Sequence, residues 1–277
     1  MTKHKNWHNL SLFFTITGSL LLTNAKAQDA YLWTIENKAG DTEKFRTYIK
    51  IKGKTLDMIG EISIFTKSTS KHTYKEIDAD GNATYDQLDE KFDGIFNGTL
   101  IQVKPADFKP ITVKRAKTGV YLSRLNPKAD VNTGYQEKVL LPTMSIPAPE
   151  KPVKVGESWK TVIINPLLKG KMIEINSTLV GVVKTLGQDA LKINVTMEFP
   201  PVPGAKPSEI VKLQETYFLS VIGHQLLQAR YTIKNPFMPF PSSSAEAKAF
   251  VTRVIAGVNE ADDPDELSML GVEKTDK

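Results

Sequence analysis

Residues 190–199, Ala-Leu-Lys-Ile-Asn-Val-Thr-Met-Glu-Phe, decide the fold class of this chain. Large apolar side chains occupy every second position and polar side chains stand between them: Leu191, Ile193, Val195, Met197 and Phe199 alternate with Lys192, Asn194, Thr196 and Glu198. Successive side chains of a β-strand point to opposite faces, so this period of two predicts a strand with one apolar face and one solvated face. Such strands are typical of antiparallel sheets that cover a core on one side.

The flanking sequence repeats this alternation, with Gly, Pro, Asn or Asp residues between the segments. In the second half of the chain, strands are expected at Glu157–Ile164 and around 173–179, 211–219 and 227–233. In the first half the pattern is less regular, and strands are expected around 45–51, 56–64, 72–77 and 101–122. We therefore predict a mostly β fold, an antiparallel meander that forms one or two curved sheets or open barrels.

Two segments are ambiguous in this pattern. Residues 84–93 contain many acidic side chains and are compatible with a short helix. Residues 245–258 fit a helix and a strand about equally, and their β-branched content favours a strand.

The N-terminus has the features of a secretory signal peptide. Lys3 and Lys5 precede an apolar run over 10–22, and Ala25-Lys26-Ala27 offers a cleavage site after Ala27. The run is too short to span a bilayer of about 30 Å as a helix, so no transmembrane anchor is expected. The prediction is an exported protein, periplasmic or extracellular, of bacterial type.

Four segments follow from these boundaries. They are a signal peptide (1–27), an N-terminal β half (28–141), a C-terminal β half (142–258) that begins in a proline-rich stretch, and an acidic tail (259–277) expected to be disordered. Whether the two halves form one sheet or two domains is left open at this point.

Composition excludes several classes of function. The formal net charge is +5, and removal of a signal peptide with three lysines and no acidic residue lowers it to +2, which argues against nucleic acid as a partner. The chain has no cysteine, so disulfides, thiolate catalysis and cysteine metal sites are excluded. Beyond the signal peptide the chain has the histidines His72 and His224, interpreted as surface residues, and we expect no metal and no cofactor.

Residues 149–159, Pro-Glu-Lys-Pro-Val-Lys-Val-Gly-Glu-Ser-Trp, form the most distinctive motif. The motif resembles a Pro-x-Lys-Pro-Val-Lys-Val-Gly-(Asp/Glu)-Ser-Trp segment of an exported bacterial family of unknown function, in which it introduces a run of β-strands. The resemblance implies a β-rich exported domain and no assigned chemistry. Read physically, Gly156 permits a tight turn and Trp159 then covers the concave face of the sheet.

A second motif, Asp78-Ala-Asp80-Gly81-Asn82, invites comparison with a calcium loop. An EF-hand needs Gly at its sixth position and Glu at its twelfth, whereas these positions hold Ala83 and Asp89. A hairpin turn is therefore the better interpretation.

Glu215 stands out because it falls on the apolar face of its strand, between Leu213 and Tyr217. A carboxylate there must be hydrated, hydrogen-bonded or protonated. It is interpreted as a polar anchor in a ligand cavity or, alternatively, as a residue turned outward by a bulge or bonded to Ser177 or Tyr231.

In a meander every second connection lies at the same end of the sheet, which places the loops 165–170, 200–209 and 236–245 together. These loops are rich in proline and large apolar residues, and they form a mouth for an apolar ligand or partner or, alternatively, a plug. The proposed ligand-binding residues are Trp159, Glu215, Tyr217, Tyr231, Phe237, Met238 and Phe240.

No catalytic motif occurs, and we predict a non-enzymatic protein with no catalytic residues. The first hypothesis is an exported β protein that binds an apolar or amphipathic ligand, such as a hydrophobic small molecule or lipid, or an envelope protein. The alternatives are a structural or surface interaction module with a filled core and a carboxylate-dependent hydrolase.

Overall fold

The computed structural model describes residues 29–34, 36–54, 61–103, 108–125, 146–164, 171–200, 204–235 and 245–259. Within these ranges the chain is built from β-strands, with one 3-10 turn at Pro207–Glu209. The predicted mostly β, antiparallel fold is therefore confirmed. The predicted signal peptide and nearly all of the acidic tail lie outside the described residues.

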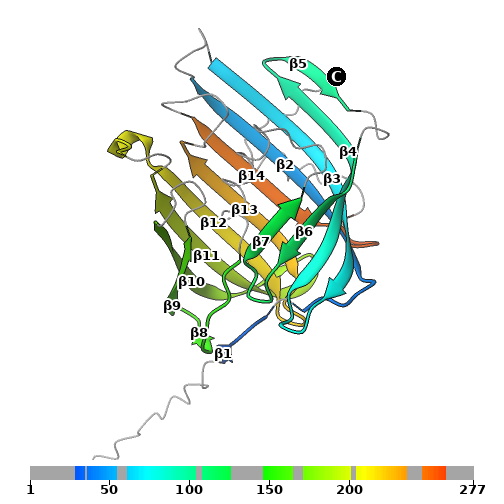
Figure 1. Ribbon diagram of the computed structural model, residues 1–277, viewed down its shortest axis with the longest axis vertical. Coiled ribbons are helices and arrows are strands. Elements are labelled where there is room, and N and C mark those ends of the chain that lie inside the picture. The colour runs from blue at the N-terminus through cyan, green and yellow to red at the C-terminus, as the bar shows by residue number, and fades with distance from the viewer. Residues whose placement is uncertain are drawn as a thin grey trace, which may run out of the picture.

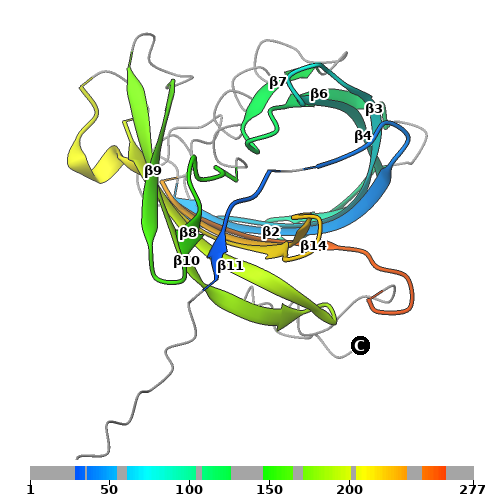
Figure 2. The ribbon, with the colours of Figure 1, turned by 90° about the horizontal axis from the view of Figure 1, so that it is seen from below.

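One large sheet contains twelve of the strands, and it curves strongly (Figures 1 and 2). Its order is β7-β6-β4-β3-β2-β14-β13-β12-β11-β10-β9, with β5 paired to β4. The bounds are β2 Thr42–Lys54, β3 Glu61–Ile77, β4 Ala83–Phe96, β5 Thr99–Gln102, β6 Ile111–Arg115, β7 Tyr121–Leu125, β9 Ser158–Ile164, β10 Met172–Thr185, β11 Gln188–Phe199, β12 Val211–Ser220, β13 Leu226–Lys234 and β14 Glu246–Arg253.

The two halves of the chain meet in this sheet through β2 and β14. Ile51 pairs with Ala247, Ile49 with Ala249 and Thr47 with Val251 along an uninterrupted antiparallel ladder. Each half is a meander, and the pairing of β2 with β14 joins them into one surface whose edge strands are β7 and β9.

The alternation of β11 predicts its faces correctly. Leu191, Ile193, Val195, Met197 and Phe199 are buried, whereas the polar residues between them are half-buried or exposed. Their face is concave, because the short strands β1 (Ala30–Tyr31) and β8 (Val153–Lys154) lie on the inner side of the curve in Figure 2 and Val153 joins the same core. The concave face of β9–β13 thus carries the main hydrophobic core.

Two ambiguous segments are both strands. Residues 84–93 belong to β4, so the short helix considered for them is wrong. The acidic side chains that suggested a helix flank inward-facing Tyr85, which is fully buried against Tyr74 and Val113. Residues 246–253 form β14, as the β-branched content favoured.

The three proline-bearing connections lie at one end of the sheet, as predicted. The pairs Ile164–Met172, Phe199–Val211 and Lys234–Glu246 close that end. We call it the loop end, and the opposite end, with the turns 78–82, 186–187 and 221–225, the turn end. Residues 165–170, 201–203 and 236–244 of these connections lie outside the described residues.

Candidate functional site

Three of the predicted ligand-binding residues lie on one row across the concave face. Trp159 pairs with Ser177, Ser177 with Val195, Val195 with Glu215, and Glu215 with Tyr231. Tyr217 follows two positions along β12 and therefore faces the same side. Residues in one such row share a face, so the structure brings these four predicted residues to one region of the concave surface. Phe237, Met238 and Phe240 lie outside the described residues.

Glu215 is buried in this row, with 3% of its surface exposed. The Tyr217 hydroxyl donates a hydrogen bond of 2.9 Å to Oε2 of Glu215. Oε1 of Glu215 and Oγ of Ser177 are buried without a hydrogen-bond partner among the described residues. Burial raises the pKa of the Glu215 carboxyl well above its ordinary value, and the hydrogen bond from Tyr217 opposes this only in part. Burial therefore favours the neutral form of this carboxyl over the ionised form.

The alternatives considered for Glu215 are decided by the register of β12. Glu215 lies directly opposite Val195 and Tyr231, and the nearest irregularity of either ladder falls at Phe218/Leu219. The interpretation that a bulge turns Glu215 outward is therefore wrong. The Tyr217 hydroxyl is the hydrogen-bond partner that the structure shows for this carboxyl, and Ser177, one of the two partners suggested by the sequence, makes no side-chain hydrogen bond among the described residues.

Tyr217 and Tyr231 link Glu215 to a hollow in the concave face. Their rings meet edge to face with centroids 5.8 Å apart. Burial, together with the neighbouring Glu215 and Tyr231, raises the pKa of Tyr217 well above its ordinary value, so its hydroxyl stays protonated and can donate. Tyr231 lines the hollow itself, which has a volume of about 60 Å³.

Trp159 is fixed from two sides. Its ring meets that of Trp33 edge to face at 5.3 Å, and its Nε1 donates a hydrogen bond of 3.2 Å to the carbonyl oxygen of Pro147. Trp33 is buried in the same core. The prediction that Trp159 covers the concave face is confirmed. In the described chain its ring contacts Trp33 and its indole N–H is bonded to Pro147.

The hollow draws its lining from both halves of the sheet. Its walls combine aliphatic, aromatic and hydrogen-bonding side chains: Phe45, Thr47, Ser70, His72, Gln87, Arg115, Ile146, Leu226, Tyr231 and Val251. The Arg115 guanidinium is the one permanently charged group in this set. A volume of 60 Å³ accommodates a few water molecules or one small polar group, and it is far below the roughly 300 Å³ of a typical small-molecule site.

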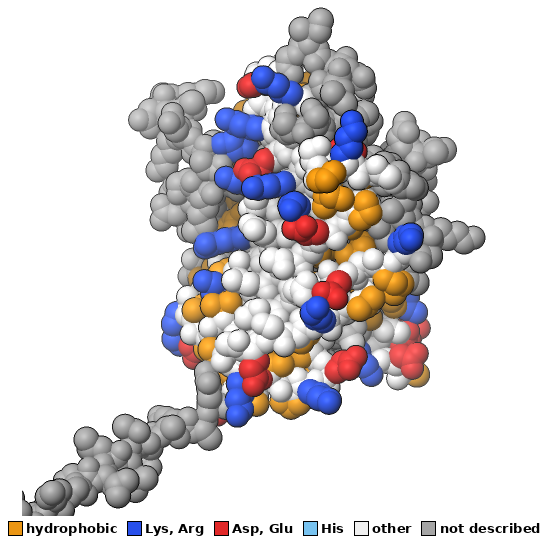
Figure 3. Space-filling view, turned by 90° about the vertical axis from the view of Figure 1, so that its left-hand side faces the viewer, with side chains coloured by type: hydrophobic (Ala, Val, Ile, Leu, Met, Phe, Trp, Pro, Cys, Tyr) orange, Lys and Arg blue, Asp and Glu red, His pale blue; other side chains and the backbone are white. Residues whose placement is uncertain are grey.

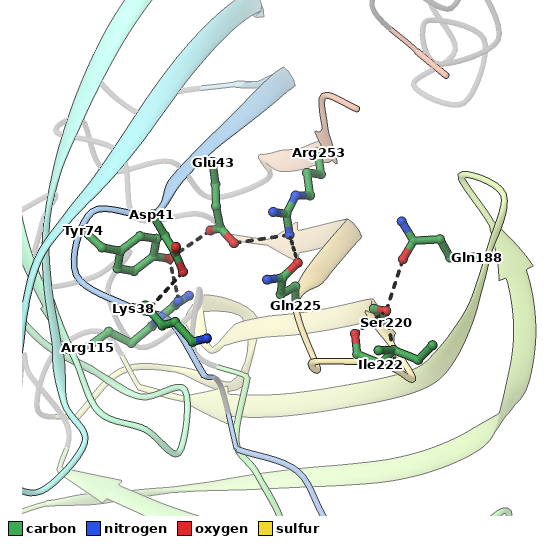
Figure 4. A network of polar contacts seen from close by, with 10 residues as sticks. All are labelled: Lys38, Asp41, Glu43, Tyr74, Arg115, Gln188, Ser220, Ile222, Gln225 and Arg253. Atoms are coloured by element: carbon green, nitrogen blue, oxygen red, sulfur yellow. Dashed lines mark hydrogen bonds and ion pairs between the residues drawn. The ribbon is translucent and has the colours of Figure 1, made fainter. Parts of the chain in front are cut away.

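A polar network holds Arg115 at the edge of the hollow (Figure 4). Nη2 of Arg115 donates to the Tyr74 hydroxyl at 3.0 Å, and that hydroxyl donates to Oε2 of Glu43 at 2.9 Å. The other oxygen of Glu43 lies 3.2 Å from Nη1 of Arg253. The Arg115 guanidinium also lies over the ring of Tyr85, 5.7 Å from its centroid. These contacts orient Arg115 on the concave side.

An apolar strip leads from the loop end to this hollow. We define it by Ile49, Ile51, Ile64, Ile233 and Ala249, which the strand pairings place on two adjacent concave rows. All five are half-buried, in contrast to the fully buried concave residues of β10–β12. Thr47 and Val251 continue the strip by one row and line the hollow, so strip and hollow are contiguous.

Larger hollows lie on the convex face and are polar. One of about 520 Å³ is lined by residues such as Glu174, Asn176 and Lys212, and another of about 600 Å³ by residues such as Lys44, Lys67 and Asp93. Figure 3, which looks onto the side where β9–β11 lie, shows both charges scattered over the surface. Ion pairs such as Lys160–Glu174 at 2.7 Å occur there. Charged and other polar side chains therefore make up most of the lining of these two convex hollows.

Most residues that line the hollow were not predicted from the sequence as binding residues. Ser70 and His72 share a face with Ile62 and Ile64, but this is visible only once 61–77 is known to be one strand. His72 lies between the rings of Phe45 and Tyr85, each 4.9 Å away, so it is half-buried on the concave face and not a surface residue at a strand start.

The motif at 78–82 forms the predicted hairpin turn. Oδ1 of Asp78 accepts hydrogen bonds from the backbone N–H groups of Asp80 and Asn82, and Oδ2 lies 3.0 Å from Nζ of Lys114. The hydrogen bond from Lys114, with those from Asn82, lowers the pKa of Asp78 to about 2. The carboxylate thus stabilises the turn itself. Nowhere in the described ranges do three or more His, Asp or Glu side chains cluster as metal ligands.

Within the same ranges, no helix combines the length and hydropathy that crossing a bilayer requires.

Neither a protein-family model nor a curated protein matches the sequence. Among solved structures, lipovitellin aligns with 82% of this chain at 6% identity and a TM-score of 0.49, and the aligned part is 26% of lipovitellin. A Bacteroides fragilis protein with a YmcC-like fold aligns with 80% of this chain and 98% of its own length, at 8% identity and a TM-score of 0.30. The hypothetical lipoprotein YmcC from Escherichia coli aligns over 79% and 90%, at 10% identity and a TM-score of 0.29. With identities of 6–10% and TM-scores of 0.29–0.49, these three matches carry no conclusion about the function of this chain.

Proposed function

We propose that this chain is an exported, non-catalytic β protein that binds an apolar or amphipathic ligand on its concave face. The observation that carries the proposal is the apolar strip, because its five aliphatic side chains are only half-buried, whereas the concave side chains of β10–β12 are fully buried. Partly exposed contiguous apolar surface next to a few polar groups is the usual composition of a ligand site. The strip also begins at the loop end, where β13 ends and β14 begins.

A specific observation favours a second candidate, a structural or surface interaction module with a filled core. The concave side chains of β10–β12, such as Ile175, Leu179 and Ile193, are at most 1% exposed. The C-terminal part of the interior is therefore filled, which leaves the strip and the small hollow as the open part of the concave face in the described chain.

A carboxylate-dependent hydrolase receives less support. In the described chain the buried carboxyl groups are Glu43 and Glu215. Glu43 is held by Tyr74 and Arg253, and Glu215 is enclosed in the apolar core. Neither of these two buried carboxyls lines one of the hollows described above, where a substrate could reach it.

The test is lipid extraction from the purified native protein followed by mass spectrometry, combined with a variant of the strip. Ile49→Asp places a charge in the strip, and Val162→Asp is the matched control because Val162 is 56% exposed and pairs with Glu174 on the convex face. We expect a bound amphiphile in the wild type and the control and its loss from Ile49→Asp. If no preparation contains a ligand, while an envelope protein co-purifies equally with all three, the interaction module is the better interpretation.

The rim residues are tested separately. Phe237, Met238 and Phe240 changed together to Ser should weaken ligand binding and leave the unfolding midpoint unchanged if they form a mouth. Unchanged binding with lost stability would identify them as a plug.

A further inference from the structure

We infer that the acidic C-terminal segment 260–272 folds back over the convex face of β2, β3 and β14 and binds there. Composition alone predicts disorder for this segment, which lies outside the described residues; the sheet offers it a binding surface. That surface lies opposite the concave site, so the inference is independent of the proposed function. It follows from outward-facing side chains that are buried, from the path of the chain after β14, and from complementary charges.

The convex face of β2 and β14 carries side chains that are buried although they face outward. The pair Thr47–Val251 lines the concave hollow, so the pairs on either side of it face the convex side. These are Arg46–Thr252 and Tyr48–Phe250. All four residues are at most 3% exposed. An outward-facing row of a sheet is buried only where other atoms lie over it, so this part of the convex face is covered.

The described end of the chain already turns onto this face. After β14 the segment 254–259 bends to the outer side of the curve (Figure 2). Nη2 of Arg46 donates a hydrogen bond of 3.0 Å to the carbonyl oxygen of Asn259. The side chain of Asn259 accepts a hydrogen bond from the N–H of Ile255 and donates one to the carbonyl oxygen of Arg253. The described part of the chain therefore ends beside the buried pair Arg46–Thr252.

The aromatic part of the covered surface is suited to apolar side chains. The rings of Tyr48 and Phe250 are stacked with centroids 6.4 Å apart, and half-buried Phe65 packs against them. The segment supplies large apolar side chains after its acidic part: Leu267, Met269, Leu270 and Val272. Their burial on an aromatic cluster is favourable.

The convex hollow of about 600 Å³ beside these pairs has an excess of positive charge. Four basic side chains and two acidic ones line it: Lys44, Arg46, Lys67 and Lys91, with Glu90 and Asp93. Residues 260–266, Glu-Ala-Asp-Asp-Pro-Asp-Glu, contain five acidic side chains and no basic one. The excess belongs to the lining as a whole and does not require any one side chain to be unpaired. Segment and surface are therefore complementary in charge.

Two pairs of lysines extend the positive surface along β2. Lys44 lies directly opposite Lys71 of β3, and Lys50 lies directly opposite Lys248 of β14. Like charges at directly opposite positions of a sheet destabilise it. Carboxylates of the segment offset this repulsion when they bind beside the lysines.

The segment is long enough for both contacts. The chain from Asn259 to Leu267 spans up to about 26 Å when extended, at roughly 3.3 Å per residue, whereas three neighbouring strands span about 10 Å. The acidic residues can therefore cross the convex hollow before the apolar residues reach the aromatic cluster.

The test is cleavage after Glu266 by glutamyl endopeptidase, followed by mass spectrometry. A synthetic peptide of residues 256–275 gives the rate for an unbound segment. We expect the purified protein to be cleaved there about 10-fold more slowly than the peptide, or slower still. The reason is that a bound segment must detach before the protease can act on it.

Charge reversal in the hollow tests the surface. Lys44→Glu with Lys91→Glu should raise the cleavage rate to that of the peptide. Lys184→Glu with Lys212→Glu is the control, because it makes the same change of charge outside the lining of the hollow, at lysines that form ion pairs as Lys44 does. The control should remain protected.

Substitutions in the segment test its side of the contact, each against a peptide with the same changes. Asp262→Lys with Asp263→Lys should abolish protection in the wild type and restore it in the Lys44→Glu, Lys91→Glu protein, because the two partners then exchange charges. Met269→Ser with Leu270→Ser leaves the sheet unaltered, should also abolish protection, and covers a failure of the hollow variant to fold. Cleavage of the wild-type protein at the rate of the peptide would overturn the inference, as would protection that none of these substitutions reduces.

Discussion

The buried carboxyl of Glu215 makes the stability of this protein depend on pH in an unusual direction. Burial raises the pKa of Glu215 in the folded state well above its ordinary value of about 4.5. As the pH rises through that ordinary value, the unfolded chain releases the proton and the folded chain keeps it. The unfolded state then binds fewer protons than the folded state, so the free energy of unfolding falls as the pH increases.

Replacement of Glu215 by Gln removes this dependence, because an amide of nearly the same shape does not titrate. The two proteins should be similarly stable near pH 4, where Glu215 is protonated in both states. Above the ordinary pKa, each pH unit should favour Glu215→Gln by about 1.4 kcal/mol, until the pH reaches the folded-state pKa of the carboxyl. Between pH 5 and pH 7 the difference therefore grows by up to about 2.7 kcal/mol.

The assay is urea unfolding at pH 5, 6 and 7, followed by the fluorescence of the packed pair Trp33 and Trp159. Glu174→Gln is the control, because Glu174 is an exposed carboxylate whose pKa is lowered, chiefly by its hydrogen bond with Lys160. This control should not gain stability over the wild type as the pH rises. Parallel stability profiles for the wild type and Glu215→Gln would refute the interpretation of Glu215 as a neutral buried acid.

Three further predictions concern the framework around the site. Gly156→Ala should destabilise the protein by about 1–2 kcal/mol in urea unfolding, because Gly156 has a φ of 92°. Gly181→Ala should cost much less, because Gly181 has an ordinary φ and an added Cβ would meet open space there, and equal losses of stability would contradict the turn argument. Asp78→Asn should remove the part of the wild type's stability that is lost as the pH falls from about 4 to about 2, because the folded-state pKa of Asp78 is about 2; acid titration followed by circular dichroism would show identical profiles if the carboxylate does not stabilise the turn. Trp33→Ala should lower the free energy of unfolding by about 3–5 kcal/mol, since Trp33 is 1% exposed, whereas Leu32→Ala should lower it by less than about 1 kcal/mol, since Leu32 is 49% exposed. Similar losses for the two variants in thermal unfolding would contradict this prediction.

Much of the candidate site could be predicted from the sequence, and the part that could not has a common cause. The alternation around Glu215 placed it on the apolar face together with Tyr217, and the face of Tyr231 was predicted in the same way. Tyr217 was not predicted as the partner of Glu215, because the choice among nearby hydroxyl groups depends on side-chain directions that a strand pattern does not contain. Gln87 and Tyr85 were missed because the acidic, solvated face of β4 resembled a helix.

The pattern along the chain was enough to predict most strands of the second half, their faces and their turns, because the β-pleat imposes a period of two and because turns need particular residues. Only the tertiary structure decided that β2 lies beside β14, since backbone hydrogen bonds between strands are alike for every pair and carry no local signal of partner choice. That pairing brings Phe45 and Thr47 beside Tyr231 and Val251 and so creates the hollow. The site therefore depends on a contact between residues some 200 positions apart, which no pattern along the chain encodes.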